Sequence, residues 1–254
     1  MRLSGRIAFV TGAANGIGLA TSVRLAAEGA KVVAMDKQSA GLDGLLSDLG
    51  DTVIASVGDI FSAADRELTL RRAREKFGGD PDVLVNCVGG STILPRADMP
   101  LVDMSEDQWD AMLAFNLKGA FLCCRDLIPM MEERGYGAIV NLTSFTGRGM
   151  MADAGVAYAT AKAGLVGFTR RLAVELAPFG IRCNAIAPGF VMTERIREYI
   201  WKAAGPDGQK QLRTRIPMGR FADPAEIAAV VSFLASDDSA YMTGAILDCN
   251  GGVL

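Results

Sequence analysis

The sequence predicts an α/β fold built on one doubly wound, seven-stranded parallel sheet with helices on both faces. Short apolar runs rich in Val, Ile and Ala alternate along the chain with longer helical patterns. These runs are almost continuously apolar, as in strands that are buried on both faces of a parallel sheet. The length of 254 residues suits one large domain covering 1–254, and no repeat or composition break divides it.

The expected elements follow from these runs in chain order. The strands are 6–11, 31–36, 52–57, 82–86, 138–143, 181–188 and 244–249. The helices lie near 17–28, 39–49, 62–77, 106–134, 156–178 and 223–236, the last opened by an Asp-Pro pair typical of a helix start.

Three irregular segments, 87–105, 145–155 and 189–217, each follow an expected strand. We therefore expect them to gather at the carboxyl edge of the sheet, where open α/β folds bind ligands. The third segment contains the turn-rich run "GPDGQKQ", and we interpret it as a lid over a substrate site.

Composition excludes several classes of function. The net charge is −3, so no basic field indicates a nucleic-acid partner. No apolar run reaches the length of a membrane span, and Gly and Asn interrupt the apolar start, unlike a signal peptide. The five cysteines show no C-x-x-C spacing, which favours free thiols in a reducing compartment and predicts a cytoplasmic protein.

Histidine is absent from the sequence. This excludes Ser-His-Asp and Cys-His catalysis and any His-ligated metal, and we expect no metal site. Acid–base chemistry must then come from Tyr, Lys, Asp, Glu or Cys.

The run "TGAANGIG" (11–18) joins the first strand to the first helix. Its glycines at 12, 16 and 18 form a variant of the dinucleotide fingerprint, in which the helix start receives a pyrophosphate. This placement predicts a Rossmann-type nucleotide site formed by Gly12, Asn15, Gly16, Ile17 and Gly18. The alternative is a glycine turn that serves only close helix–sheet packing.

Asp36 ends the second expected strand, 18 residues after Gly18. A carboxylate there can accept hydrogen bonds from both ribose hydroxyls and would repel a 2′-phosphate, so NAD(H) is favoured over NADP(H). Lys37 follows it and weakens that preference, and the alternative is an Asp that only caps the loop.

In "AYATAKAG" (157–164), Tyr158 and Lys162 stand four residues apart and would share one helix face. At an effective dielectric of about 20 and about 4 Å, the ammonium would stabilise the phenolate by about 4 kcal/mol. That corresponds to roughly three pKa units before desolvation opposes it, towards the range useful for acid–base catalysis. Alone, such a pair is more often a surface contact.

Further motifs accompany this pair in a fixed order over essentially the whole chain. Together they resemble the short-chain dehydrogenase/reductase family: "TGAANGIG", Asp59 after the third strand, "NCVGG" (86–90), "NLKG" (116–119), "NLTS" (141–144), "YATAK" (158–162), "APG" (187–189) and "GAILDCNGG" (244–252). "NCVGG" departs from the family's usual Asn-Asn-Ala-Gly, and the Ser144-to-Tyr158 separation of 14 is one residue longer than usual.

The resemblance implies four catalytic residues. Tyr158 would be the acid/base and Lys162 its pKa modulator and a ligand of the nicotinamide ribose. Ser144 would hydrogen-bond the substrate oxygen, and Asn116 would hold a water that links Lys162 to solvent. As alternatives, Ser144 could only end a strand beside the competing hydroxyl of Thr143, and Asn116 could be a satisfied polar group.

The resemblance also implies further cofactor contacts. Asp59 and Ile60 would frame the adenine, and Asn86 and Gly89 would pass near the adenosine ribose. The nicotinamide end would be bordered by Pro188, Gly189, Val191 and Thr193, the last reaching the carboxamide or pyrophosphate. Thr193 could instead be an ordinary loop residue.

These expectations describe an NAD(H)-dependent oxidoreductase acting on a secondary alcohol or ketone. Two alternatives stay open: an NADPH-dependent 3-oxoacyl-carrier-protein reductase type, and a non-catalytic nucleotide-sensing protein. Arg148 is a candidate for an anionic substrate group, although a solvated arginine is commoner. Aromatic residues and methionines of the irregular segments allow an apolar or mixed substrate. By resemblance, a homotetramer or homodimer is expected.

Overall fold

The structure is a computed structural model that describes residues 1–254 except 95, 97, 150–153 and 254. Its centre is a seven-stranded, wholly parallel sheet with the order β3-β2-β1-β4-β5-β6-β7. The order reverses direction between β1 and β4, which creates the crevice typical of doubly wound folds. The strands are β1 Ile7–Thr11, β2 Lys31–Asp36, β3 Val53–Val57, β4 Val83–Asn86, β5 Gly137–Leu142, β6 Ile181–Pro188 and β7 Ile246–Cys249.

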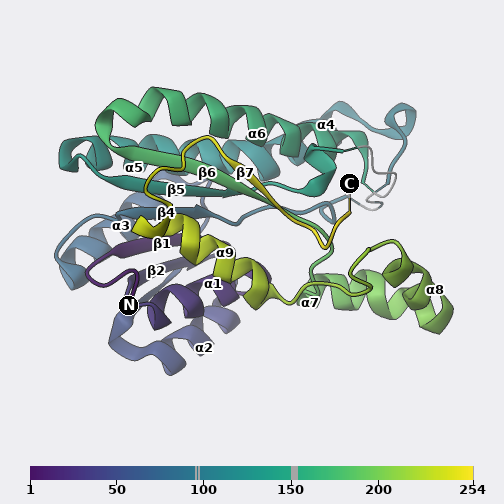
Figure 1. The fold of residues 1–254 in the computed structure, drawn as a ribbon, viewed down its shortest axis with the longest axis horizontal. Helices are drawn as coiled ribbons and strands as arrows, with labels where there is room; N and C mark the ends of the chain where they lie inside the picture. Colours follow the sequence, from purple (N-terminus) through teal and green to yellow (C-terminus); the bar gives the residue numbers. More distant parts are fainter. Residues whose placement is uncertain (95, 97, 150–153, 254) are drawn as a thin grey trace.

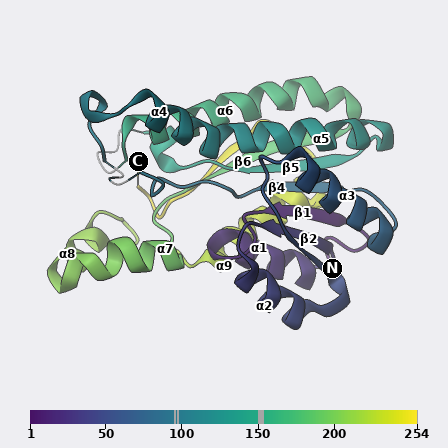
Figure 2. The same ribbon diagram turned by 180° about the vertical axis from the view of Figure 1, so that it is seen from behind.

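Helices cover both faces of this sheet (Figures 1 and 2). The helices are α1 Gly16–Ala27, α2 Ser39–Leu49, α3 Ala63–Phe77, α4 Glu106–Leu113, α5 Gly119–Arg134, α6 Val156–Leu176, α7 Glu194–Ile196, α8 Lys202–Thr214 and α9 Pro224–Ala235. Short 3-10 turns lie at Gly50–Thr52, Leu101–Asp103, Phe145–Gly147, Ala177–Phe179 and Asp237–Ser239.

Two apolar cores separate the three layers. Within β1, Ala8 and Val10 face the core beneath α1, α2 and α9, whereas Ile7 and Phe9 face the core beneath α3, α5 and α6. Both sides of the strand are therefore buried, which explains its continuously apolar sequence. The predicted doubly wound parallel sheet is confirmed, and its strand boundaries fall within two residues of those expected.

Two expected segments differ from the structure. The helix expected over 106–134 is divided, because a widened π-type turn at Ala114–Lys118 separates α4 from α5. The prediction of an irregular 189–217 segment is wrong for most of its length, since α7, a second π-type turn at Arg197–Trp201 and α8 occupy 194–214. Gly205 has a φ of 62° and interrupts the helix, which begins again at Pro206. The run "GPDGQKQ", which resembles a turn in sequence, therefore lies mostly within helix.

Helices α7 and α8, which belong to the segment interpreted from the sequence as a lid, extend beyond the sheet rather than over it, as Figures 1 and 2 show. They have a small core of their own around Ile216, Phe221 and Val253, against which Trp201 and Leu212 pack. Within the described ranges, no helix has both the length and the apolar character needed to cross a membrane.

Candidate active site

A cleft of about 410 Å³ opens at the carboxyl edge of the sheet. The loops that follow β1 to β6 line it, so segments distant in sequence meet there. Nearly all of the residues predicted for the site share it, whereas Asn86 and Asn116 are not part of its lining. Those that line it are Gly12, Asn15, Gly16, Ile17, Gly18, Asp36, Asp59, Ile60, Gly89, Ser144, Tyr158, Lys162, Pro188, Gly189, Val191 and Thr193.

The glycine loop has the geometry of an anion cradle. Gly12 and Gly16 have φ values of 66° and 55°, which side-chain-bearing residues rarely adopt. A Cβ at Gly18 would collide with the carbonyl oxygen of Gly12, so the helix could not start this close to the strand. The start of α1 therefore lies at the cleft, and the positive end of a helix dipole there favours an anion, so this part of the cleft is called the anion pocket.

An acidic side chain from the lid already contacts this pocket. The N–H of Gly16 donates a hydrogen bond of 3.0 Å to Oε2 of Glu194, the first residue of α7. A carboxylate thus lies where the helix start favours an anion. No local sequence pattern predicts this contact, because 178 residues separate its partners.

The Asp36 carboxylate stabilises the glycine loop through hydrogen bonds. One carboxylate oxygen accepts from the N–H of Ala14 and the other from the N–H of Gln38, each at 3.0 Å. Asp36 therefore caps the loop, as the alternative interpretation held, and it also lines the cleft. Because each carboxylate oxygen has a second lone pair, capping leaves acceptors for ribose hydroxyls.

The basic residue after Asp36 is neutralised locally. Lys37 Nζ lies 2.9 Å from a carboxylate oxygen of Asp59. Burial alone would raise the pKa of Asp59, but the N–H of Phe61 and the Lys37 ammonium together hold it below its usual range. The Lys37 side chain is thus directed to the loop that follows β3.

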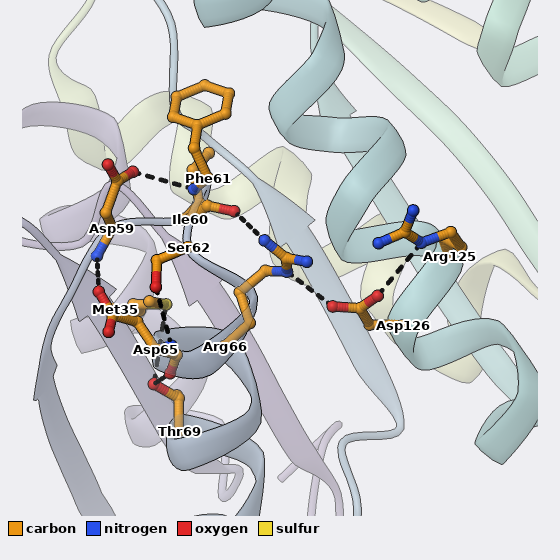
Figure 3. Close-up of polar contacts among 10 residues, drawn as sticks. All are labelled: Met35, Asp59, Ile60, Phe61, Ser62, Asp65, Arg66, Thr69, Arg125 and Asp126. Carbon is orange, nitrogen blue, oxygen red and sulfur yellow. Dashed lines mark hydrogen bonds and ion pairs between the residues drawn. The ribbon is translucent and has the colours of Figure 1, made fainter.

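The expected adenine wall is held by a polar network beneath it (Figure 3). The N–H of Asp59 donates to Asp65 at 2.8 Å, and the guanidinium of Arg66 donates to the carbonyl of Ile60 at 2.6 Å. Arg66 is 2% exposed and pairs at 2.6 Å with Asp126 of α5. The sequence analysis missed this arginine, since its neighbours on α3 form an ordinary charged helix face.

Asn86 is directed into the sheet. Its side-chain amide donates to Oδ1 of Asn141, its register partner on β5, at 2.8 Å, and the residue is 5% exposed. The expected place beside a ribose is not observed for this side chain. Its neighbours Cys87, Val88 and Gly89 line the cleft instead.

Asn116 lies in the widened turn between α4 and α5 and is 2% exposed. Its Oδ1 accepts from the N–H of Gly90 at 2.8 Å, and its amide donates to the carbonyls of Gly90 and Met112, both at 3.1 Å. A Cβ at Gly89 would stand 2.8 Å from Asn116 Oδ1 and 2.7 Å from Lys162 Nζ. Glycine at 89 therefore keeps the region between the amide and the ammonium open.

Tyr158 and Lys162 lie one turn apart near the start of α6, on the face that meets the cleft. Lys162 is 3% exposed, and its ammonium donates to the carbonyl of Leu142 at 2.8 Å. Burial lowers the pKa of Lys162 to about 8. Its Nζ stands 5.8 Å from the centre of the Tyr158 ring.

The expected lowering of the Tyr158 pKa is wrong. Burial raises the pKa of Tyr158 above its ordinary value, and a hydrogen bond with Ser144 and the charge of Arg195 only partly oppose this rise. Desolvation of the phenolate therefore outweighs the charges and hydrogen bonds that favour it. The phenol is therefore protonated at neutral pH and positioned to donate.

Ser144 and Thr143 have separate roles. The Thr143 hydroxyl donates to the carbonyl of Lys162 at 2.8 Å and fastens β5 to α6. Ser144 Oγ accepts from the N–H of Thr146 at 3.2 Å and from its hydroxyl at 2.9 Å, which leaves the Ser144 proton to donate elsewhere. The Thr143 hydroxyl is thus occupied, whereas the Ser144 hydroxyl can still donate a hydrogen bond into the cleft.

The loop after β6 forms the opposite wall. A Cβ at Gly189 would stand 2.7 Å from Asn250, so glycine permits close packing against the loop after β7. Thr193 caps α7, its hydroxyl accepting from the N–H of Ile196 at 3.3 Å, while its methyl approaches Gly16. The structure places Thr193 at the edge of the anion pocket.

Part of the cleft lining is apolar and includes Phe145, Phe190, Ile196 and Ile200. The rings of Phe145 and Phe190 lie 5.2 Å apart and continue into the lid core, so the packing interpretation and the pocket interpretation both hold for them. Met150 and Met151, which the sequence analysis grouped with these aromatics, lie outside the described residues.

Arg148 is not at this site. It donates to the carbonyl of Ile246 at 2.7 Å and pairs with Asp248 at 3.3 Å, away from the cleft lining. The arginine that does line the cleft is Arg195 of α7, which the sequence analysis did not single out. The one sequence feature that could have indicated a role for Arg195 is its position two residues after Thr193, a predicted cofactor contact.

Comparison with known proteins gives consistent matches. A family model described as Enoyl-(Acyl carrier protein) reductase matches residues 12–254. The chain is 39% identical to a 3-oxoacyl-acyl-carrier-protein reductase of Thermotoga maritima, with 100% of both chains covered. It is 40% identical to a D-threitol dehydrogenase of Mycolicibacterium smegmatis, over 99% of this chain and 94% of that protein.

Solved structures agree with these sequence matches. A levodione reductase has a TM-score of 0.90 to this chain at 33% identity, covering 99% of this chain and 98% of that one. The similar proteins are thus named for different substrates, whereas each of them matches nearly the whole length of this chain.

Proposed function

The chain belongs to the short-chain dehydrogenase/reductase family, and from that premise we propose an NAD(H)-dependent oxidoreductase with Tyr158 as its acid/base. Members of this family are oxidoreductases that act on alcohol or ketone substrates with a nicotinamide cofactor. The observation that carries the proposal is the convergence of Ser144, Tyr158 and Lys162 on the cleft that also contains the glycine loop.

The cleft fits such a cofactor along its length. The α1 start would bind the pyrophosphate, Asp36 the adenosine ribose, and Asp59 with Ile60 the adenine. When bound, the nicotinamide supplies or accepts the hydride. Lys162, whose ammonium lies beside Gly89, would hold the second ribose.

This chain's residues would then manage the proton. In reduction, the Tyr158 hydroxyl donates its proton to the substrate oxygen as Ser144 donates a hydrogen bond to the same oxygen. In oxidation, the phenolate accepts the alcohol proton. The buried Lys162 ammonium stabilises that phenolate, and Asn116 would anchor the water that connects Lys162 to solvent.

The preference for NAD(H) rests on two side chains. The Asp36 carboxylate would repel a 2′-phosphate, and Lys37, the nearby cation that could attract one, is paired with Asp59. These contacts support NAD(H) over NADP(H).

A second candidate is a reductase of the 3-oxoacyl-carrier-protein type that uses NADPH. The match to the Thermotoga maritima protein favours this candidate, whereas Asp36 opposes it. A nucleotide-sensing protein without catalysis is the remaining alternative, and the complete set of Asn116, Ser144, Tyr158 and Lys162 argues against it.

Oligomerisation is also part of the proposal. Several apolar side chains of α5 and α6, and of the turn after α6, are exposed, including Phe121 at 44%, Val174 at 68% and Phe179 at 45%. These surfaces support association into a homotetramer or homodimer.

Substitution of Tyr158 by Phe tests the proposal, because it removes only the hydroxyl. We expect turnover of every alcohol in a panel assayed with NAD to be lost, while the fluorescence titration with NADH stays close to that of the wild type. Tyr199→Phe is the matched control, since that residue is 70% exposed on the lid. Retained turnover in Tyr158→Phe would refute the acid/base assignment.

A further inference from the structure

Arg195 brings a guanidinium into the cleft from the first turn of the lid. The side chain is half-buried, and its closest hydrogen-bond partner is the carbonyl of Gly89 at a long 3.5 Å. A Cβ at Gly90 would collide with this guanidinium, so the glycine pair after β4 makes room for it. In the described part of the chain, no acidic side chain pairs with Arg195.

The other basic side chains at the cleft are compensated. Lys37 pairs with Asp59 at 2.9 Å, and Lys162 donates to the carbonyl of Leu142 at 2.8 Å. Arginine retains its charge at any accessible pH, and its planar donors match carboxylate and phosphate oxygens. A half-buried guanidinium without an acidic partner therefore favours an anion supplied by a ligand.

The position of this charge relative to the reactive groups identifies which ligand. Arg195 shares the cleft with Ser144 and Tyr158, and its guanidinium contacts the carbonyl of Gly89, a residue at which a Cβ would stand 2.7 Å from Lys162 Nζ. In agreement with this position, its charge opposes the rise in the pKa of Tyr158. The Glu194 carboxylate, its neighbour, faces the anion pocket at Gly16 instead. The guanidinium thus lies towards the end of the cleft where the substrate reacts.

We propose that Arg195 is a specificity-determining residue that binds an anionic group of the substrate, a carboxylate or a phosphate. The substrate class is then an anionic hydroxy or oxo compound whose carbon skeleton contacts Phe145, Phe190 and Ile196. This inference rests on the proposed function, because it assumes that an alcohol or ketone reacts at Tyr158.

Matched substrate pairs test the proposal. A series of oxo acids and their methyl esters is reduced with NADH by the wild type, Arg195→Met, Arg195→Lys and Arg197→Met. Arg197 is exposed on the same segment and outside the cleft lining, so its variant controls for net charge.

We expect the wild type to prefer the acids. Arg195→Met should lower kcat/KM for the acids at least about tenfold, mainly through KM, and leave the esters unchanged. Arg195→Lys should restore part of this loss, and Arg197→Met should match the wild type. The limb of the pH profile that reports Tyr158 ionisation should also move to higher pH in Arg195→Met, since a nearby cation has been removed.

Four results would overturn the proposal. Equal losses for acids and esters would assign Arg195 a merely structural role. A raised Kd for NADH with an unchanged acid-to-ester ratio would assign its anion to the cofactor's pyrophosphate. A wild type that reduces esters but not acids would contradict the inference while leaving the proposed function standing, and no reduction in either series with NADH or NADPH would reject both.

A measurement on the wild type alone keeps the proposal testable if Arg195→Met does not fold. Short-chain carboxylates should inhibit competitively against the oxo ester, and their uncharged amides should not. Equal inhibition by both would exclude a site for anions.

Discussion

Replacing Glu194 by Gln should strengthen cofactor binding. Oε2 of Glu194 accepts a hydrogen bond of 3.0 Å from the N–H of Gly16, at the start of α1. A dinucleotide pyrophosphate would use the same N–H and the same positive end of the helix. The carboxylate and the ligand therefore compete, and the carboxylate must move before the pyrophosphate can bind.

The size of the effect follows from that competition. A charge at an exposed helix start contributes about 0.3–1 kcal/mol, which favours the closed contact by about twofold to fivefold. Because only the open fraction binds the ligand, the apparent Kd of the wild type is raised about threefold to sixfold. A neutral amide at 194 would lose this charge contribution and leave the closed and open forms about equally populated, so NADH should bind Glu194→Gln about 1.5-fold to threefold more tightly.

Fluorescence titration with NADH measures the change. Glu198→Gln is the matched control, because Glu198 lies on the same segment, is exposed, and pairs with Lys202 at 2.6 Å rather than with the glycine loop. Glu194→Asp separates contact from simple charge repulsion, since the side chain keeps its charge but is one methylene shorter. We expect Glu194→Asp to bind NADH more tightly than the wild type does.

An unchanged or weaker affinity in Glu194→Gln would refute this reasoning, because the carboxylate would then not occupy the position of the pyrophosphate. If Glu194→Gln tightens binding and Glu194→Asp does not, the effect comes from long-range charge alone and the hydrogen bond to Gly16 has no part in it.

Two further predictions concern the cofactor preference and the buried lysine. Asp36→Ala should reduce the ratio of the NADPH Kd to the NADH Kd by about tenfold, because a carboxylate that repels the 2′-phosphate is lost. Asp43→Ala, at an exposed position of α2, should leave this ratio unchanged. A wild type that binds NADPH more tightly than NADH would contradict the role assigned to Asp36. Lys162 has a pKa of about 8 in the folded protein, below its unfolded value, so the folded state binds fewer protons than the unfolded chain between these values. The free energy of unfolding of the wild type should therefore rise relative to that of Lys162→Met as pH increases from about 8 towards 10.5. Urea unfolding at a series of pH values measures this. A pH-independent difference between the two proteins would show that the Lys162 ammonium is not desolvated.

Local patterns predicted the framework of the site. The strands at 31–36 and 181–188 were predicted with the boundaries that the structure has, because continuous apolar runs encode burial on both faces. The glycine positions are local too, since Gly12 and Gly16 adopt backbone conformations that follow from the turn itself. The helical spacing that places Tyr158 and Lys162 on one face was equally readable.

Side-chain partners were less predictable than positions. Asn86 belongs to a family motif, yet its amide pairs with Asn141 across the sheet and does not reach the cleft. Arg148, the arginine considered for an anionic substrate group, pairs with Asp248, whereas Arg195, which was not considered, lines the cleft. Neither arrangement follows from residue type or spacing.

The sequence by itself determined the parallel sheet, the glycine turn and the one-turn spacing of phenol and ammonium, because each depends on neighbours within a few residues. Only the tertiary structure decided the direction of the Tyr158 pKa, the contact of Glu194 with Gly16 and the position of Arg195. Those features depend on burial and on chain segments up to 178 residues apart, whose approach no local pattern encodes.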